Sequence, residues 1–205
     1  LGDSAIRHMS AVLERFEKEL YPTLSARHSD MPVVPDGARS STMNINSVHG
    51  GQEEGHEGLP APCVADSCRM IIDRRFLIEE SLDDVRGEVR ELLEDVARTR
   101  PDFRFDLREL FAVEPSLADK DAPVASTTAA AIREILKREP EFICSPGTYD
   151  QKHVDRIGKL KDCIAYGPGV LDLAHQPDEW VGIEDMTSAA KVMALTTARL
   201  LGQVE

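Results

Sequence analysis

The stretch from Tyr166 to Trp180 carries the chain's clearest chemical pattern. A Gly-Pro-Gly turn at 167–169 is followed by a single histidine, His175, and then by Pro177, Asp178 and Glu179. Glycine lets the backbone approach a ligand closely, and a neutral imidazole is a good zinc donor. Taken alone, a loop histidine beside carboxylates is more often a surface residue than a ligand, so the residues themselves leave both interpretations open.

The same stretch resembles the C-terminal signature of a known family. It is similar to the Gly-Pro-Gly turn and Ala-His-x-x-Asp/Asn-Glu loop of the acetylornithine deacetylase / succinyl-diaminopimelate desuccinylase / aminoacylase family of dinuclear zinc metallohydrolases. That resemblance implies that His175 binds one of two zinc ions, with cobalt or manganese as substitutes. A hydrogen-bond acceptor for the other ring nitrogen would then fix the tautomer of the imidazole.

A second resemblance lies at Gly147-Thr148-Tyr149-Asp150, which follows an apolar segment. The family has a Gly-Gly/Ala-Thr-Asp turn near its substrate, so Gly147 and Thr148 are implied to contact substrate. This chain departs from the pattern by the extra Tyr149 and by Pro146. An ordinary helix start, with Asp150 as N-cap, is the alternative interpretation.

A third resemblance covers residues 64–75, which end in Arg75. They are similar to the family's Asn-x-Val-Pro-Asp-x-Cys…Asp-x-Arg strand, whose arginine reaches the substrate carboxylate. A planar guanidinium suits bidentate carboxylate binding, so Arg75 is implied to bind substrate. Pro62 stands where the family has asparagine, and Ala65 where it has proline. The alternative is that Arg75 is a solvated charge at a strand end.

The remaining metal ligands and the general base of this family lie in its N-terminal half, as a His-x-Asp, a bridging Asp and a Glu-Glu pair. We expect no such His-x-Asp motif here, and we interpret Glu53-Glu54 as a solvated charge pair in a loop. The chain alone is therefore expected to lack most of its catalytic site, to hold zinc incompletely and to be inactive. A rival structural zinc site at His49, His56, Cys63 and Cys68 has spacings that fit no common finger.

The first part of the chain, residues 1–113, is expected to form a lid and dimerisation domain. Hydrophobic spacing predicts an α-β-β-α-β order, one strand short of the ferredoxin-like layout. We expect its first strand to precede Leu1. The predicted elements are a helix over 4–20 stopped by Pro22, strands at 41–48 and 66–75, a helix that Ser81 caps and Pro101 ends, and a strand at 103–108.

Residues 114–205 are expected to be the C-terminal segment of an α/β/α zinc-exopeptidase-like domain. Helices alternate there with short apolar strands, which favours parallel α/β structure. The fold class is thus α/β with an α+β lid. The predicted elements are helices at 124–137, 151–158 and 183–201, with strands at 142–144 and 163–166.

Composition limits the partners. The net charge of −13 argues against nucleic acid, and no apolar run is long enough for a membrane span. The four cysteines are sparse and irregular, and no signal peptide is visible, so we expect a reducing, cytoplasmic location. The resemblance implies a homodimer formed through the lid and a small N-acyl amino acid or peptide substrate.

The expected function is part of a zinc-dependent amidohydrolase that cleaves an N-acyl amide or peptide bond. Whether it is a deacylase or a dipeptidase stays open. A non-catalytic dimerisation or binding module derived from that family is the alternative.

Overall fold

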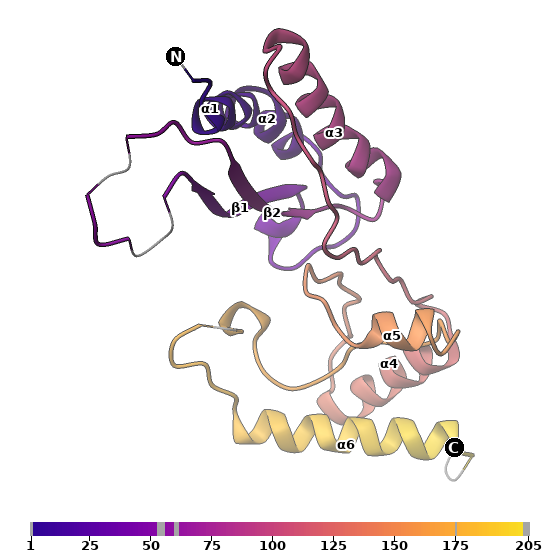
Figure 1. Cartoon of the computed structure of the whole chain (residues 1–205). Coiled ribbons are helices and arrows are strands. Elements are labelled where there is room, and N and C mark those ends of the chain that lie inside the picture. The colour runs from indigo at the N-terminus through magenta and orange to yellow at the C-terminus, as the bar shows by residue number, and fades with distance from the viewer. Residues whose placement is uncertain (1, 53–55, 60–61, 175, 203–205) are drawn as a thin grey trace. The chain divides into compact units, whose positions relative to one another are not determined.

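A computed structural model of the chain describes residues 2–52, 56–59, 62–174 and 176–202 (Figure 1). The chain divides into two compact units. The first unit comprises Leu1–Asp30 with Arg39–Ala112, and the second comprises Met31–Ala38 with Val113–Glu205. None of the helices in these described ranges combines the length and the apolar character that crossing a bilayer demands.

The first unit opens with one continuous helical run. It consists of α1 (Ala5–Arg15), a π-helical segment (Phe16–Leu20) and α2 (Tyr21–Ser25). The prediction that Pro22 stops this helix was wrong. Pro22 lies in the first turn of α2, directly after the π turn, where the wider backbone accommodates a residue without an N–H.

An antiparallel pair of strands, β1 (Thr42–Gly50) and β2 (Cys68–Arg75), lies against the helices. Both strands were predicted, with the correct inward face, because their apolar residues alternate. Met43 is buried in the core, and Ile45, Met70 and Ile72 pack against it. A register shift between Ile45 and Ser47 then breaks the alternation in β1.

Helix α3 (Leu82–Thr99) completes the core. Ser81 caps it as predicted, because its Oγ accepts a hydrogen bond of 3.1 Å from the backbone N–H of Asp84. The core of this unit joins large side chains from the helices, β1 and the segment after α3. They are Val12, Phe16, Leu20, Leu24, Met43, Val89, Leu92, Leu93, Val96 and Phe103.

The strand predicted at 103–108 is not formed. The segment buries Phe103 and stacks it on Phe105, with ring centroids 5.7 Å apart, so the alternation correctly reports which side chains face the core. A strand also needs a neighbour for its backbone groups, and within the described part of the chain β1 and β2 pair only with each other.

The second unit is built on two packed helices, α4 (Pro123–Leu136) and α6 (Ile183–Leu200), with the shorter α5 (Gln151–Arg156). Two single 3₁₀ turns, Asp36–Ala38 and Leu171–Leu173, lie in its loops. The buried residues of α4 and α6 are small: Ala125, Thr128, Ala129 and Ala131 on α4, and Ala189, Val192 and Thr196 on α6.

The two strands predicted in this unit are absent from its described residues. The segment 142–144 makes only an isolated parallel bridge, in which Cys144 pairs with Val33. The segment 163–166 forms no ladder, and the backbone oxygen of Cys163 accepts instead from Gln151 Nε2 at 2.5 Å. An apolar run becomes a strand only beside another strand, and the described residues of this unit supply none. Helix α5 also ends at Arg156, before the predicted Gly158.

Candidate functional site

The two arginines that end β2 have opposite environments. Arg74 follows Met70 and Ile72 on the inward face of the strand, and its side chain is only 7% exposed. Arg75 lies on the other face, with its side chain 64% exposed. The period of two along a strand therefore assigns one arginine to the interior and leaves the other accessible to a ligand.

Arg74 is held in a charged cluster, which we define as Arg27, Arg74, Glu80 and Glu88. Arg74 Nη2 donates to Glu80 Oε1 at 2.7 Å and to Glu88 Oε2 at 3.2 Å. Arg27 Nη1 donates to Glu80 Oε1 at 2.8 Å and also pairs with Glu88. Two carboxylates thus balance two guanidinium groups at a partly buried position, which is the condition under which buried charge is tolerated.

Glu80 is the centre of this cluster. Its second oxygen, Oε2, accepts from the backbone N–H of Leu77 at 2.7 Å and from the hydroxyl of Ser41. Burial acts to raise the pKa of this carboxyl, but the hydrogen bonds from Ser41, Leu77 and the two arginines outweigh it. The pKa of Glu80 is therefore lowered to about 2, and the group is ionised throughout the neutral range.

The charged cluster was not anticipated from the sequence. Its members come from the segment after α2, from β2, from the turn before α3 and from α3 itself, so no local spacing marks them. One signal was available, because Arg74 continues the inward register of Met70 and Ile72 and so requires a carboxylate partner. The cluster ties these segments together beside Arg75.

Arg75 itself has few constraints. Its Nε lies 3.6 Å from Asp73 Oδ2, and both side chains are largely exposed. Its register partner on β1 is Thr42. The geometry leaves the planar fork of the guanidinium open, so it is able to take a carboxylate in two parallel hydrogen bonds.

The turn at Gly147 and Thr148 is closed by its own side chains. The backbone N–H of Gly147 donates to Ser145 Oγ at 3.1 Å, and Ser145 Oγ lies 2.9 Å from Tyr149 Oη. A Cβ on residue 147 would stand 3.2 Å from the ring of Tyr149, the residue by which this chain departs from the family pattern. Thr148 is exposed, and Asp150 precedes α5 without a side-chain capping bond.

The Gly-Pro-Gly turn requires glycine at its last position, because Gly169 has φ of +100°. The 3₁₀ turn Leu171–Leu173 follows and leads to Ala174. His175, the implied zinc ligand, lies outside the described residues, as do Glu53 and Glu54.

No three His, Cys, Asp or Glu side chains gather closely enough for a shared metal ion anywhere in the described ranges. His49, His56, Cys63 and Cys68 all fall in these ranges and form no such group. A His-x-Asp spacing does occur twice. At His28-Ser29-Asp30, His28 Nδ1 lies 3.0 Å from Ser40 Oγ and the Asp30 N–H donates to Glu79. At His153-Val154-Asp155, Asp155 Oδ2 accepts from Ser116 Oγ. These residues by themselves therefore do not fit a two-zinc centre.

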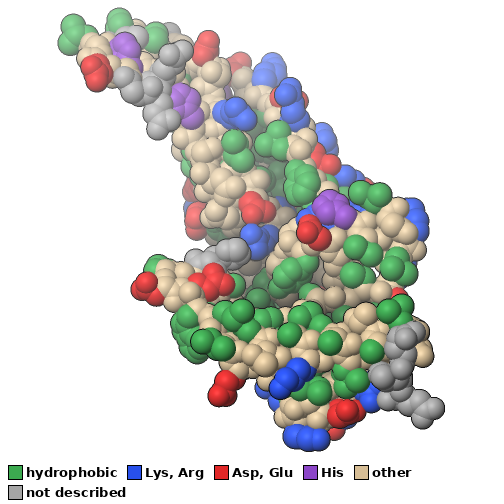
Figure 2. All heavy atoms as spheres, turned by 90° about the horizontal axis from the view of Figure 1, so that it is seen from below, with side chains coloured by type: hydrophobic (Ala, Val, Ile, Leu, Met, Phe, Trp, Pro, Cys, Tyr) green, Lys and Arg blue, Asp and Glu red, His purple; other side chains and the backbone are tan. Residues whose placement is uncertain are grey.

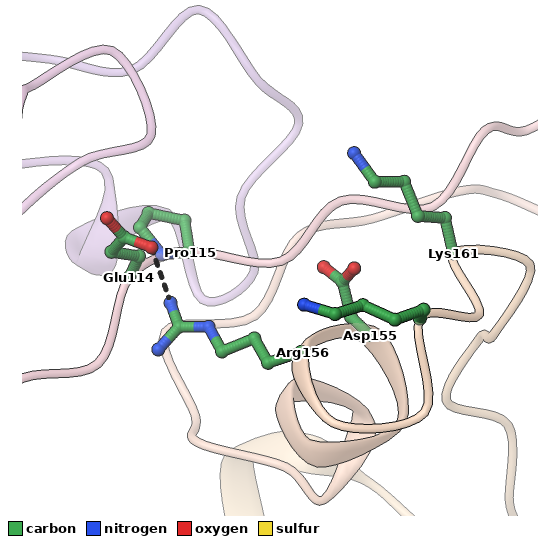
Figure 3. A pocket seen from close by; sticks show the side chains of 6 residues that line it. Glu114, Pro115, Asp155, Arg156 and Lys161 are labelled. Atoms are coloured by element: carbon green, nitrogen blue, oxygen red, sulfur yellow. Dashed lines mark hydrogen bonds and ion pairs between the residues drawn. The ribbon is translucent and has the colours of Figure 1, made fainter.

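The second unit has a hollow of about 490 Å³ that none of the predicted site residues line (Figure 3). Its lining is charged: Glu114, Pro115, Asp155, Arg156, Lys159 and Lys161. Arg156 Nη2 donates to Glu114 Oε2 at 3.2 Å, and Asp155 Oδ2 accepts from Ser116 Oγ at 3.0 Å. Cations and carboxylates partly neutralise one another there, so the hollow has no clear preference for a ligand.

Comparison with known proteins decides the family. The model of Peptidase family M20/M25/M40 matches residues 9–199, which cover both units. The chain belongs to this family. The resemblance drawn from the three sequence motifs is thereby confirmed, because relatives in the M20 family carry the names that the motifs suggested.

Curated relatives of this M20 chain include two acetylornithine deacetylases. The one from Pectobacterium carotovorum is 27% identical over 142 residues, which are 68% of this chain and 32% of the relative. The one from Myxococcus xanthus is 24% identical over 201 residues, 98% of this chain and 48% of the relative. A succinyl-diaminopimelate desuccinylase from Nitrosomonas europaea is 24% identical over 194 residues, which are 88% of this chain and 48% of the relative. The chain thus spans a third to a half of these relatives.

A solved structure has the same fold. It is an M20 family metallo-carboxypeptidase from Sulfolobus solfataricus, with a TM-score of 0.57 and 15% identity. The match covers 96% of this chain and 45% of that one. The mixed α and β character of the fold prediction is therefore confirmed.

Proposed function

We propose that this chain is part of a zinc-dependent amidohydrolase that cleaves an N-acyl amide or peptide bond of an amino-acid-like substrate. Residues 1–113 would form the lid and residues 114–205 the C-terminal part of the catalytic domain. The observation that carries the proposal is the family match over residues 9–199. The names of the relatives, two deacetylases and a desuccinylase, support an N-acyl amino acid as substrate.

In this proposal Arg75 binds the carboxylate of the substrate. Its exposed guanidinium at the end of β2 supports the role, and so does the contrast with Arg74, which is only 7% exposed and whose Nη2 the charged cluster already uses. Thr148 is also proposed to contact the substrate, because its side chain is exposed to solvent. Gly147 would contact substrate through backbone atoms other than its N–H, because that N–H already donates a hydrogen bond to Ser145 Oγ.

His175 is proposed to bind one metal ion. Zinc, cobalt or manganese would each accept an imidazole nitrogen as a ligand. The chain matches less than half of each relative quoted above, and the ligands that complete a two-metal centre are assigned to the part that it does not match. The isolated chain is accordingly proposed to be inactive.

The first unit is proposed to be a lid of ferredoxin-like topology that forms the homodimer. Its helices α1 and α3 contact each other and pack on the inward residues of β1 and β2, as in a layer of helices on a sheet (Figure 1). A cytoplasmic location belongs to the same proposal, supported by the four cysteines, which are few and irregularly spaced along the sequence.

A non-catalytic dimerisation or binding module is the second candidate. It is favoured by one observation, that the first unit has its own core and its own charged cluster and so has the interactions of an independently stable body. In that case Arg75 would have no effect on any hydrolytic reaction.

The test is a chimera in which this chain replaces the region that it matches in the Myxococcus xanthus acetylornithine deacetylase. With zinc, we expect hydrolysis of N-acetylornithine by the chimera and none by the isolated chain. Arg75→Ala should lower kcat/KM about 10- to 100-fold, the value of a charged hydrogen-bonded contact. Arg69→Ala, on the same face of β2, is the matched control and should change it less than about 2-fold.

Metal-dependent hydrolysis by the isolated chain would contradict the assignment of the missing ligands. An active chimera that responds equally to Arg75→Ala and Arg69→Ala would remove the role of Arg75. A folded chimera without activity would favour the binding module.

A further inference from the structure

The side chain of Arg75 has few contacts, but its backbone is held by the neighbouring Arg74. The Nη1 of Arg74 donates a hydrogen bond to the backbone oxygen of Arg75. Arg75 is the last residue of β2, and its register partner Thr42 is the first residue of β1. The end of a ladder is where strand pairing opens most easily. A hydrogen bond from a side chain to this last carbonyl therefore fixes the backbone at the point where strand pairing stops.

Arg74 is itself fixed through the other end of its guanidinium group. Its Nη2 donates to Glu80 Oε1 at 2.7 Å and to Glu88 Oε2 at 3.2 Å. Its Nε is buried and makes no hydrogen bond with any of the residues that the structure describes. The two terminal nitrogens thus have separate partners, because carboxylates bind one and the carbonyl of Arg75 binds the other. The planar guanidinium keeps these two nitrogens at a fixed spacing, which the single nitrogen of a lysine could not do.

Burial distinguishes these contacts from the ion pairs on the surface. Figure 2 shows Lys and Arg side chains beside Asp and Glu side chains on the outside of the molecule, where water screens their charges. The side chain of Arg74 is only 7% exposed, and those of Glu80 and Glu88 are 11% and 19% exposed. Charge-assisted hydrogen bonds are stronger in such a site. Arg74 therefore has little freedom to move, and so has the carbonyl that it holds.

Glu80 also fixes the segments on both sides of the Thr42–Arg75 pair. Its Oε2 accepts a hydrogen bond of 2.7 Å from the backbone N–H of Leu77, two residues after Arg75. The same oxygen accepts from the hydroxyl of Ser41, the residue before Thr42. One buried carboxylate thus ties together the two chain segments that leave the sheet beside Arg75, and it binds Arg74 as well.

We propose that Arg74 is a positioning residue for the carboxylate-binding Arg75, a role that rests on the proposed function. The Asp-x-Arg pattern leaves the middle position unspecified, so the resemblance assigns nothing to Arg74. The side chain of Arg75 is 64% exposed and lies 3.6 Å from Asp73, so the place of its guanidinium group depends mainly on the backbone beneath it. An anchored backbone limits the positions of that group and lowers the entropy lost when a carboxylate binds.

Arg74→Lys separates the two sets of partners. Lysine keeps the positive charge beside Glu80 and Glu88, but its single nitrogen cannot also take the place of Nη1. In the chimera with the Myxococcus xanthus relative, KM for N-acetylornithine should rise about 5- to 10-fold, the value of one hydrogen bond from a charged group. The kcat should stay unchanged, because the carboxylate is held equally in the substrate and in the transition state.

Arg27→Lys is the matched control. Arg27 contacts Glu80 and Glu88 through one nitrogen, Nη1, so a lysine is able to replace it. Within the described ranges no hydrogen bond joins Arg27 to Arg75. Arg27→Lys should therefore change KM less than about 2-fold.

A double-mutant cycle distinguishes positioning from a general structural effect. In the Arg75→Ala background, Arg74→Lys should change KM less than about 2-fold, because the side chain that it positions is gone. An equal rise of KM in both backgrounds would overturn the proposal, since it would show that Arg74 acts on the fold and not through Arg75.

A measurement on the isolated chain needs no catalysis. The backbone oxygen of Arg75 and the N–H of Phe76 belong to one planar peptide unit, so the NMR order parameter of the Phe76 N–H reports how firmly that oxygen is held. The order parameter should fall from about 0.85 to below about 0.6 in Arg74→Lys and stay high in Arg27→Lys. An unchanged order parameter in Arg74→Lys would overturn the proposal.

A second variant covers a failure of Arg74→Lys to fold. Arg74→Met combined with Glu88→Gln removes one charge of each sign, so the remaining pair stays balanced while the hydrogen bond to the carbonyl of Arg75 is lost. It carries the same expected results. An inactive chimera would count against the amidohydrolase, whereas the order parameter of Phe76 would still decide whether Arg74 holds Arg75. An active chimera in which neither KM nor that order parameter changes would support the amidohydrolase and overturn the role of Arg74.

Discussion

The two units of this chain are stabilised in different ways. The first unit buries large side chains such as Phe16 and Leu24 completely and ties its segments together by the charged cluster. The second unit buries mainly alanine, threonine and valine between α4 and α6, and leaves Ile157, Trp180 and Ile183 mostly exposed. Leu110 and Phe111 of the first unit are also mostly exposed. Hydrophobic stabilisation is proportional to the apolar area removed from water, so the first unit, which buries the larger side chains, has the more stabilising core.

That difference bears on function. A unit with its own core is able to hold an accessible residue such as Arg75 at a fixed place, because the strand beneath it is anchored.

The largest expected change in the free energy of unfolding comes from a substitution that creates a cavity in the core of each unit. Phe16→Ala should destabilise the first unit by about 4 kcal/mol, because it removes a fully buried aromatic ring. Val192→Ala, at the largest fully buried position of α6, should cost the second unit about 2 kcal/mol or less. Hydrogen exchange on peptides from each unit would measure both values, and equal losses would contradict the difference between the cores.

Glu80→Gln should have the next largest effect, about 3 kcal/mol in the first unit. The substitution removes one of the two carboxylates that balance the charges of Arg27 and Arg74 at a partly buried site. Glu91→Gln on the exposed side of α3 is the matched control and should change the free energy of unfolding by less than about 0.5 kcal/mol.

The pH dependence of the first unit follows from the same residue. The folded pKa of Glu80 is about 2, below its ordinary value of 4.5, so its contribution is fully present above about pH 4.5 and is lost as the pH falls toward 2. Urea unfolding at several pH values should show this loss in the native chain and a weaker one in Glu80→Gln. An identical acid profile in the two proteins would show that Glu80 is not the group responsible.

The smallest effect concerns the start of α3. Ser81→Ala removes the hydrogen bond from the Asp84 N–H to Ser81 Oγ and should cost about 1 kcal/mol. Ser81→Asp restores an acceptor and should recover most of it. The midpoint of urea unfolding would report the destabilisation by Ser81→Ala and its recovery in Ser81→Asp. A loss from Ser81→Ala as large as that from Glu80→Gln would mean that Ser81 stabilises more than the start of α3.

Local patterns predicted the elements whose causes are local. The period of apolar residues gave α3, α4 and α6 to within a few residues at each end, and Ser81 marked the start of α3. The same patterns failed at 103–108, 142–144 and 163–166. Alternation or an apolar run reports burial, whereas a strand also depends on a partner that lies far away in the sequence.

The sequence by itself determined the family, through three motifs in the right order, and the inward and outward faces of β1 and β2. Only the tertiary structure decided which side chains hold the inward arginine, Arg74. The register of Arg74 and Arg75 on β2 sets the faces, but the partners of Arg74 come from separate segments that only folding brings together. The exposure of α6 is a tertiary property for the same reason, because a helical period shows that a face is apolar and does not show what covers it.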